Sequence, residues 1–161
     1  MKMKQAVILL LLITSTNFVF AKHASLSGKV LNNEKYDEIH LQDIQFNTIE
    51  TQKPDENGNF KFETKFTKFD FYLVAFDNEN FVVFFPEPGE DSKMTIDLND
   101  LRNPTITNSR HSELYYEYSN KLGVLTGDNE RIDLIKTMID EHSNSPTCIF
   151  FIDLLDADTY F

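Results

Sequence analysis

The 161-residue sequence contains a single cysteine, no tryptophan, and only five glycines and five prolines. One thiol cannot close a disulfide within the chain or run a dithiol redox cycle alone, which excludes a fold held by disulfides. So few glycines and prolines exclude a collagen-like repeat or a low-complexity chain. What the sequence has instead is 41% hydrophobic residues, with 15 Phe and 6 Tyr. This composition predicts one ordinary globular domain.

Basic side chains are also scarce. Fifteen Lys and Arg stand against 26 Asp and Glu, which gives a formal net charge of −11. Nucleic acids and anionic membrane surfaces are recognised through a basic surface, so the charge argues against both as partners. An acidic surface suits a basic partner or a cation, and it also keeps an exported protein in solution.

The long apolar run lies at the start of the chain. Lys2 and Lys4 precede an apolar stretch over residues 6–20, and Val19 and Ala21 place short side chains at the positions that a signal peptidase recognises. This order is typical of a secretory signal peptide, and the run is shorter than the roughly 20 residues that span a bilayer. We expect residues 1–21 to be removed, with no membrane insertion afterwards. The remaining 140 residues lose two lysines and no acids, so they carry a charge of −13 and are expected in the periplasm or outside the cell.

Short segments that alternate between apolar and polar residues occupy the first part of the remaining chain. They cover residues 26–31, 38–42, 59–66, 69–76, 81–85 and 94–98, with turn residues between them. Strict alternation is typical of antiparallel sheets that have one wet and one dry face. Residues 71–76 are apolar on both faces, which predicts a central strand. We predict a small antiparallel β-sandwich or barrel of six to seven strands over residues 22–103.

Beyond Pro104 the period becomes helical. Ser109 is a candidate N-cap for a helix that carries Glu113 in its first turn. A second amphipathic helix follows a break at Gly127, and Ser145 with Pro146 signals the start of a third. The predicted class is therefore α+β, with two to three helices over residues 104–161.

The residue types that carry catalysis or bind metals do not form a recognisable motif. The histidines are scattered, at His23, His40, His111 and His142. The segment that begins at Asp55 looks like a calcium loop, but Phe60 and Phe66 stand where that loop needs glycine and glutamate. Asn57 and Gly58 favour a hairpin turn instead. We therefore predict no catalytic residue, no metal site and no cofactor, and we expect the protein not to be an enzyme.

An apolar helix near the end of the sequence is the best candidate for a contact with another molecule. Phe150, Phe151, Ile152 and Leu155 form a hydrophobic face that little remaining chain can cover. We predict that this face binds a protein partner or a second copy of the chain. Another candidate is the consecutive pair Phe84 and Phe85, because only one of the two rings can point into the core of a sandwich.

Cys148 leaves several interpretations open. In the first turn of a helix, the positive end of the helix dipole lowers the pKa of a thiol and makes it reactive. The apolar residues that follow favour burial, in which case the cysteine acts as a small hydrophobic side chain. Core packing is the favoured interpretation, and a redox thiol or a disulfide-linked dimer are the alternatives.

Several short motifs occur together in a characteristic order. They are residues 27–30 (SGKV), 55–62 (DENGNFKF), 84–91 (FFPEPGED), 94–97 (MTID), 105–109 (TITNS) and 142–146 (HSNSP). Over about Ala24 to Leu155, the chain resembles the N-terminal domain of unknown function that precedes the thioredoxin-like domain of exported bacterial thiol-disulfide oxidoreductases.

This resemblance implies an antiparallel β domain followed by helices, in a protein of the bacterial envelope. The redox centre of those relatives is a Cys-x-x-Cys motif in the thioredoxin-like domain, and a sequence with one cysteine has no such motif. No catalytic residue can therefore be transferred. The implied role is a non-catalytic accessory or protein-interaction module, and the alternative is a truncated or accessory part of a thiol-disulfide oxidoreductase system.

Overall fold

The computed structural model describes residues 23–66, 70–152 and 154–155. The predicted signal peptide lies outside these residues. The strands are β1 (Ala24–Leu31), β2 (Ile39–Gln42), β3 (Thr48–Gln52), β4 (Asn59–Phe66), β5 (Tyr72–Ala75), β6 (Phe81–Phe84), β7 (Asp91–Asp97) and β8 (Thr105–Thr107), and the helices are α2 (Arg110–Val124), α3 (Asp128–His142) and α4 (Cys148–Ile152).

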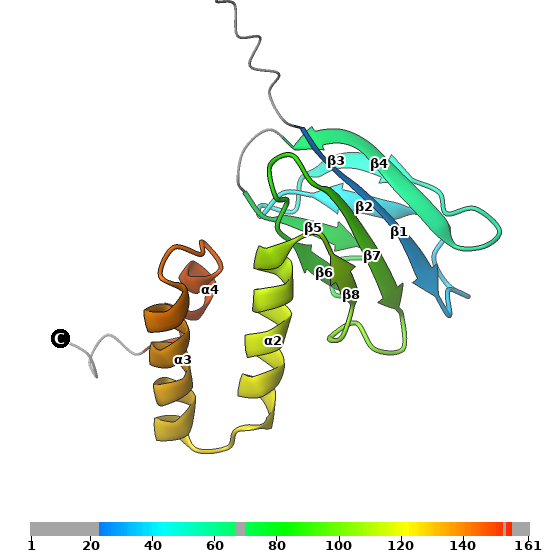
Figure 1. Cartoon of the computed structure of the whole chain (residues 1–161). Coiled ribbons are helices and arrows are strands. Elements are labelled where there is room, and N and C mark those ends of the chain that lie inside the picture. The colour runs from blue at the N-terminus through cyan, green and yellow to red at the C-terminus, as the bar shows by residue number, and fades with distance from the viewer. Residues whose placement is uncertain (1–22, 67–69, 153, 156–161) are drawn as a thin grey trace, which may run out of the picture.

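The strands form two four-stranded sheets, with the orders β4-β1-β7-β8 and β3-β2-β5-β6. Figure 1 shows the sheets packed as a sandwich, with α2 beside it and α3 and α4 on the far side of α2. The predicted α+β class with helices at the end is confirmed. The described residues hold eight strands, however, rather than six to seven.

The two strands that the alternation did not predict are β3 and β8. Four of the five residues of β3 are polar, and its Ile49 is exposed, so no apolar row marks it in the sequence. Only three residues form β8, of which Ile106 alone is buried. Because β8 pairs with β7, the sandwich continues to residue 107, past the expected boundary at 103.

One strand pair departs from the predicted antiparallel arrangement. β1 and β7 run parallel over seven residue pairs, from Ser25 with Asp91 to Leu31 with Asp97. The other pairs in the two sheets are antiparallel. Alternation records which face of a strand is buried but not the direction of its neighbour. The purely antiparallel prediction was wrong at this pair for that reason.

The core of the sandwich lies between the sheets. Both sheets contribute buried side chains, among them Leu26, Val30, Ile39, Leu41, Phe60, Phe62, Phe66, Val74, Val82, Phe84, Met94 and Ile96. Each such side chain stabilises the fold by about 2 kcal/mol. β5 lies between β2 and β6 and is covered on both faces, which confirms the central strand predicted from its apolar sequence.

Gly28 provides space within this core. It lies on β1 between Phe60 of β4 and Met94 of β7. A Cβ atom at this position would stand 2.6 Å from Cζ of Phe60 and would also meet the carbonyl oxygen of Met94. The ring of Phe60 therefore fills the volume that a side chain at position 28 would need.

Helix α2 is fixed to the sandwich through the edge of β6. Alternate residues at this edge turn their backbone groups away from β5. The N–H of Val83 donates to Oη of Tyr116 (2.8 Å), and that hydroxyl donates to the carbonyl of Val83 (3.1 Å). Directly after β6, the N–H of Phe85 donates to Oγ of Ser112 (2.9 Å), and Oγ of Ser109 donates to the carbonyl of Phe85 (2.6 Å).

The side chains of Ser109, Ser112 and Tyr116 make the hydrogen bonds that a neighbouring strand would otherwise make with this edge. Ser109 is the N-cap of α2, and Ser112 and Tyr116 follow it on the same face of the helix. Both serines are fully buried, so their hydrogen bonds with Phe85 form away from water. Burial raises the pKa of the Tyr116 hydroxyl, which keeps it protonated and able to donate. The edge of β6 is thereby closed to pairing with another chain.

The edge of β4 is capped by a carboxylate of the opposite sheet. Glu50 of β3 accepts hydrogen bonds from the N–H of Glu63 (2.9 Å), the N–H of Thr64 (2.8 Å) and Oγ1 of Thr64 (2.6 Å). Burial opposes ionisation of Glu50, but these bonds and one from Gln52 outweigh it and hold its pKa below the usual value. Glu50 therefore joins the two sheets at this corner of the sandwich.

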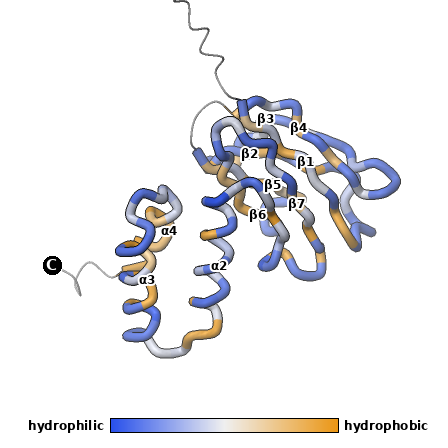
Figure 2. The backbone as a smooth tube through the Cα atoms, in the orientation of Figure 1, coloured by the Kyte–Doolittle hydropathy of each residue, from blue (hydrophilic) through white to orange (hydrophobic). Residues whose placement is uncertain are grey.

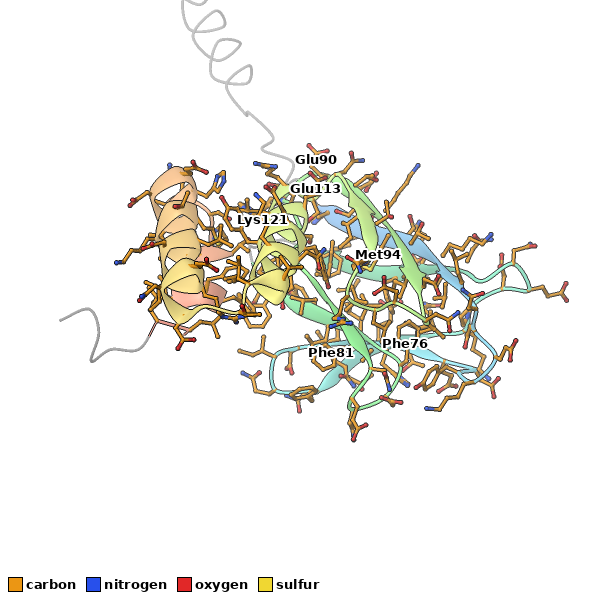
Figure 3. All side chains as sticks on the ribbon, turned by 90° about the horizontal axis from the view of Figure 1, so that it is seen from below. Phe76, Phe81, Glu90, Met94, Glu113 and Lys121 are labelled. Atoms are coloured by element: carbon orange, nitrogen blue, oxygen red, sulfur yellow. The ribbon has the colours of Figure 1, made fainter. Side chains whose placement is uncertain are left out.

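A second core lies among the helices. Leu114, Tyr118 and Leu122 of α2 pack against Ile135 and Met138 of α3, and within each helix these residues are three or four positions apart. In Figure 2, hydrophobic and hydrophilic colours alternate along α2 and α3, whereas α4 is mostly hydrophobic. Figure 3 shows side chains of α2 filling the space between α3 and the sandwich. No helix within the described ranges has the length and apolar character needed to cross a bilayer.

Ser112→Ala tests the closure of the β6 edge. The variant removes the acceptor of the buried Phe85 N–H, so we expect the unfolding free energy to fall by about 1–3 kcal/mol in denaturant titrations. Ser143→Ala, at an exposed position after α3, is the matched control and should change stability by less than about 0.5 kcal/mol. Equal effects of the two variants would contradict the role of Ser112.

Glu50→Gln tests the corner between β3 and β4. A carboxyl whose pKa is lowered on folding stabilises the protein above its unfolded pKa, and this contribution is lost as the pH falls. We expect the variant to be less stable than wild type at neutral pH, with the difference disappearing towards about pH 3. Urea titrations over this range measure it, with Glu56→Gln in an exposed turn as control. A difference that is constant with pH would argue against an ionised Glu50.

Candidate functional site

The third helix begins at Cys148, two residues after Pro146, which the sequence predicted as its first position. Pro146 follows Ser145, and the Oγ of Ser145 accepts a hydrogen bond from the N–H of Thr147 (3.3 Å). The N–H of Cys148 donates to the carbonyl of Ser145 (3.1 Å). This turn starts α4, whose five residues are Cys-Ile-Phe-Phe-Ile.

A histidine joins this turn to two other segments. Nδ1 of His111, in the first turn of α2, lies 3.0 Å from Oγ of Ser145, and Nε2 lies 3.5 Å from the Glu87 carboxylate. Oγ1 of Thr147 donates to the carbonyl of His111 (3.0 Å), and Glu87 accepts from the N–H of Arg110 (2.6 Å). These contacts hold α4 against the start of α2. The sequence placed His111 in a helix but gave no sign of these partners, which are distant along the chain.

The aromatic residues of α4 pack inside the chain. The ring of Phe150 lies 4.4 Å from the ring of Phe71, 5.2 Å from that of Phe85 and 5.5 Å from that of Tyr115, measured between centroids. Phe151 is buried in the helical core. Phe150 therefore links the helices to the outer face of the β3-β2-β5-β6 sheet, and Phe151 links α4 to α2 and α3.

This packing changes the interpretation of Phe84 and Phe85. The two rings do point to opposite faces, with Phe84 in the core between the sheets and Phe85 on the outer face. Both are fully buried, however, because Tyr115 and Phe150 cover Phe85. The expectation that one ring faces solvent or a partner was wrong, since the chain's own helices cover that face.

The outward side of α4 exposes apolar side chains. Ile149 is 63% exposed, Ile152 is 47% exposed, and Leu154, just after the helix, is 56% exposed. Ile149 and Ile152 are three residues apart and therefore lie on one face of the helix. We call these three side chains the α4 surface. Of the four residues predicted to make contacts, Ile152 is exposed, whereas Phe150, Phe151 and Leu155 pack against the helical core.

Sequence reasoning did not assign Ile149 and Leu154 to the contact face. Every residue from Ile149 to Ile152 is apolar, so hydropathy alone does not separate the covered side of the helix from the open one. Ile149 and Ile152 are three residues apart, which places them on one face of a helix. This spacing identifies the exposed face once Phe150 and Phe151 are known to pack against the rest of the chain.

Cys148 lies in the helical core. Its side chain is buried with Leu114, Met138 and Phe151. The thiol donates a hydrogen bond to the carbonyl of His142, with Sγ and oxygen 3.2 Å apart. Burial raises the pKa of this thiol, which is opposite to the lowering that a reactive cysteine needs. The geometry agrees with the favoured interpretation of Cys148 as a packing residue.

The calcium-like segment forms a turn at Asn57 and Gly58, as the sequence predicted, but not a hairpin between paired strands, because β3 and β4 belong to different sheets. The Asp55 carboxylate accepts hydrogen bonds from the side chain of Asn59 and from the N–H groups of Asn59 and Asn57, which lowers its pKa. Gly58 has a φ of +81°, where a Cβ would meet the carbonyl of Val30. Within the described residues, His, Cys, Asp and Glu form no group of three or more that could hold a metal ion.

A thiol titration tests the environment of Cys148. We expect a disulfide reagent to leave the native protein unmodified at neutral pH and to modify one thiol per chain after denaturation, because the thiol is buried and its pKa is raised. The absorbance of the released thiolate measures the reaction, and a Cys148→Ser variant controls for other nucleophiles. Rapid modification of the native protein would instead support a redox thiol.

Comparison with known proteins relates the sandwich to a described family. Residues 20–115 match the family model described as Domain of unknown function (DUF4369). The matched region includes all eight strands and ends within α2, so α3 and α4 lie beyond it. No match was found among the curated proteins or the solved structures. Because the model matches more than half of the chain, the protein belongs to the DUF4369 family.

Proposed function

We propose that the chain is an exported, non-catalytic module that binds another protein through the α4 surface. The observation that carries this proposal is the exposure of Ile149, Ile152 and Leu154 on a helix whose other side is fully engaged. Neighbouring apolar side chains that remain in water are favoured sites of protein contact, because their burial gains free energy without leaving a polar group unpaired.

The position of the α4 surface suits a stable contact. Phe150 is packed among three aromatic rings, and the turn before the helix is held by His111 and Thr147. Side chains on a fixed backbone lose little conformational entropy when they bind, which favours affinity. The helix therefore presents its exposed side without rearrangement of the chain.

Charge indicates what kind of surface the partner has. The chain carries a formal net charge of −11. Opposite charges at the rim of an interface speed association and disfavour wrong partners. We infer that the partner offers an apolar patch bordered by lysine or arginine.

Export and the relation to thiol-disulfide oxidoreductases are further parts of the proposal. Export is supported by the basic and then apolar pattern of residues 1–21. The order of motifs from Ser27 to Pro146 supports an accessory role beside a thioredoxin-like protein of the bacterial envelope. In the alternative, the chain is a truncated or accessory part of an oxidoreductase system, and the redox chemistry belongs to another polypeptide.

Replacing Ile149 and Ile152 with serine tests the α4 surface. We expect the double variant to keep its melting temperature, because both side chains are exposed, and to lose binding of a dye specific for exposed apolar surface. A photo-crosslinking residue at position 154 should give one defined adduct in cells that export the wild-type chain. The same residue at Val124, which is 80% exposed at the end of α2, is the control and should give none.

Two results would overturn the proposal. The first is the lack of any adduct at position 154. The second is an adduct that persists unchanged in the Ile149→Ser/Ile152→Ser variant. An adduct with the mass of a chain dimer would identify the partner at α4 as a second copy.

A further inference from the structure

Two turns of the sandwich, one between β2 and β3 and one between β3 and β4, have the same hydrogen bonds but different residues at one position. Asp43 and Asp55 each accept, through their carboxylates, the N–H groups two and four residues later. In both turns the N–H three residues later donates to the carbonyl of the aspartate, over 3.0 Å and 2.8 Å. The residue that makes this bond is Gly58 in one turn and Phe46 in the other.

Phe46 adopts a backbone conformation that favours glycine. Its φ is +63°, close to the +81° of Gly58 in the matched turn. A phenylalanine in the left-handed region is strained, since its Cβ crowds the backbone. Strain of this kind is often retained where the side chain has a function.

The side chain of Phe46 is only partly packed against the rest of the fold. The residue is 50% exposed, and among the described residues its ring makes an edge contact with Phe81 at a centroid distance of 6.0 Å. Ile44 and Ile49 beside it are 43% and 47% exposed. The tip of the β2–β3 hairpin thus presents a phenylalanine between two isoleucines, with no charged side chain from residue 44 to residue 49.

A hollow lies next to this tip. It measures about 180 Å³ between β6, the segment before β8 and helix α2. Its walls include Phe81, Val83, Leu101, Arg102, Tyr116 and Ser119. Phe81, labelled in Figure 3, belongs both to the wall of the hollow and to the ring contact with Phe46. A protruding ring and an aromatic-lined hollow are therefore neighbours on one surface.

We propose that this surface binds a second copy of the chain, with Phe46 of each protomer inserted into the hollow of the other. A protrusion and a hollow side by side are self-complementary under a two-fold rotation, which gives a closed, isologous dimer. The charges agree. Asp43 begins the turn that carries Phe46, Arg102 lines the hollow, and the proposed two-fold contact places these opposite charges on facing surfaces. An arginine that lines the hollow also interacts favourably with an inserted aromatic ring.

Sedimentation equilibrium of the purified chain against concentration tests this proposal. We expect wild type to form a reversible dimer of micromolar to millimolar Kd, since the contact surface is small. Phe46→Gly should raise the Kd by roughly tenfold or more, because the aromatic anchor is lost. Its melting temperature should stay within about 4 °C of wild type, because relief of the left-handed conformation offsets the lost ring contact.

Variants at the hollow distinguish this dimer from other associations. Arg102→Glu should weaken dimerisation by reversing the charge opposite Asp43, and Arg102→Lys should retain most of it. Ile149→Ser/Ile152→Ser should leave the Kd unchanged, so failure of the α4 proposal and failure of this one are separable. A monomer at all concentrations up to roughly 1 mM, or an equally tight dimer in Phe46→Gly, would overturn the proposal.

Discussion

The arrangement of the molecule depends on the hydrogen bonds between the edge of β6 and one face of α2. Backbone groups at a sheet edge need partners when they are buried, and Ser109, Ser112 and Tyr116 supply them at Val83 and Phe85. These bonds fix where α2 lies, because the spacing of backbone groups along β6 must match the spacing of side chains along the helix. With α2 fixed, α3 packs on its far side and α4 is brought over the outer face of the sheet, where Phe150 covers Phe85.

The other sheet edges are each protected by a different device. Glu50 caps β4 at consecutive N–H groups, β8 is only three residues long, and the pairing of β3 with β2 is interrupted by a register shift near Ile49. Short edges, bulges and inward-pointing charges all hinder pairing with another chain. The edges of the sandwich are therefore poor templates for an added strand.

The sequence predicted those features of the fold that neighbouring residues determine. The alternation along β4, the Asn57-Gly58 turn and the cap at Ser109 are each determined by neighbouring residues, and the structure contains all three. The parallel pairing of β1 with β7 and the cover over Phe85 depend on segments far apart in the chain, which periodicity does not encode. The same distinction between local and long-range features applies to the candidate site. The apolar character of α4 was visible in the sequence, but the separation of Phe150 and Phe151 from Ile149 required knowledge of what packs against the helix.

Phe46 shows why a site of this kind escapes sequence analysis altogether. An isolated phenylalanine between polar residues is an ordinary feature, and only its φ, compared with that of Gly58 in a turn with the same hydrogen bonds, shows that the fold accommodates it at a cost. The two surfaces also differ in their relation to the family. The hairpin that carries Phe46 lies within residues 20–115, the region that matches DUF4369, whereas α4 lies beyond it. The contact proposed for Phe46 therefore lies within the part of the chain that matches the family model, and the contact proposed for α4 lies outside it.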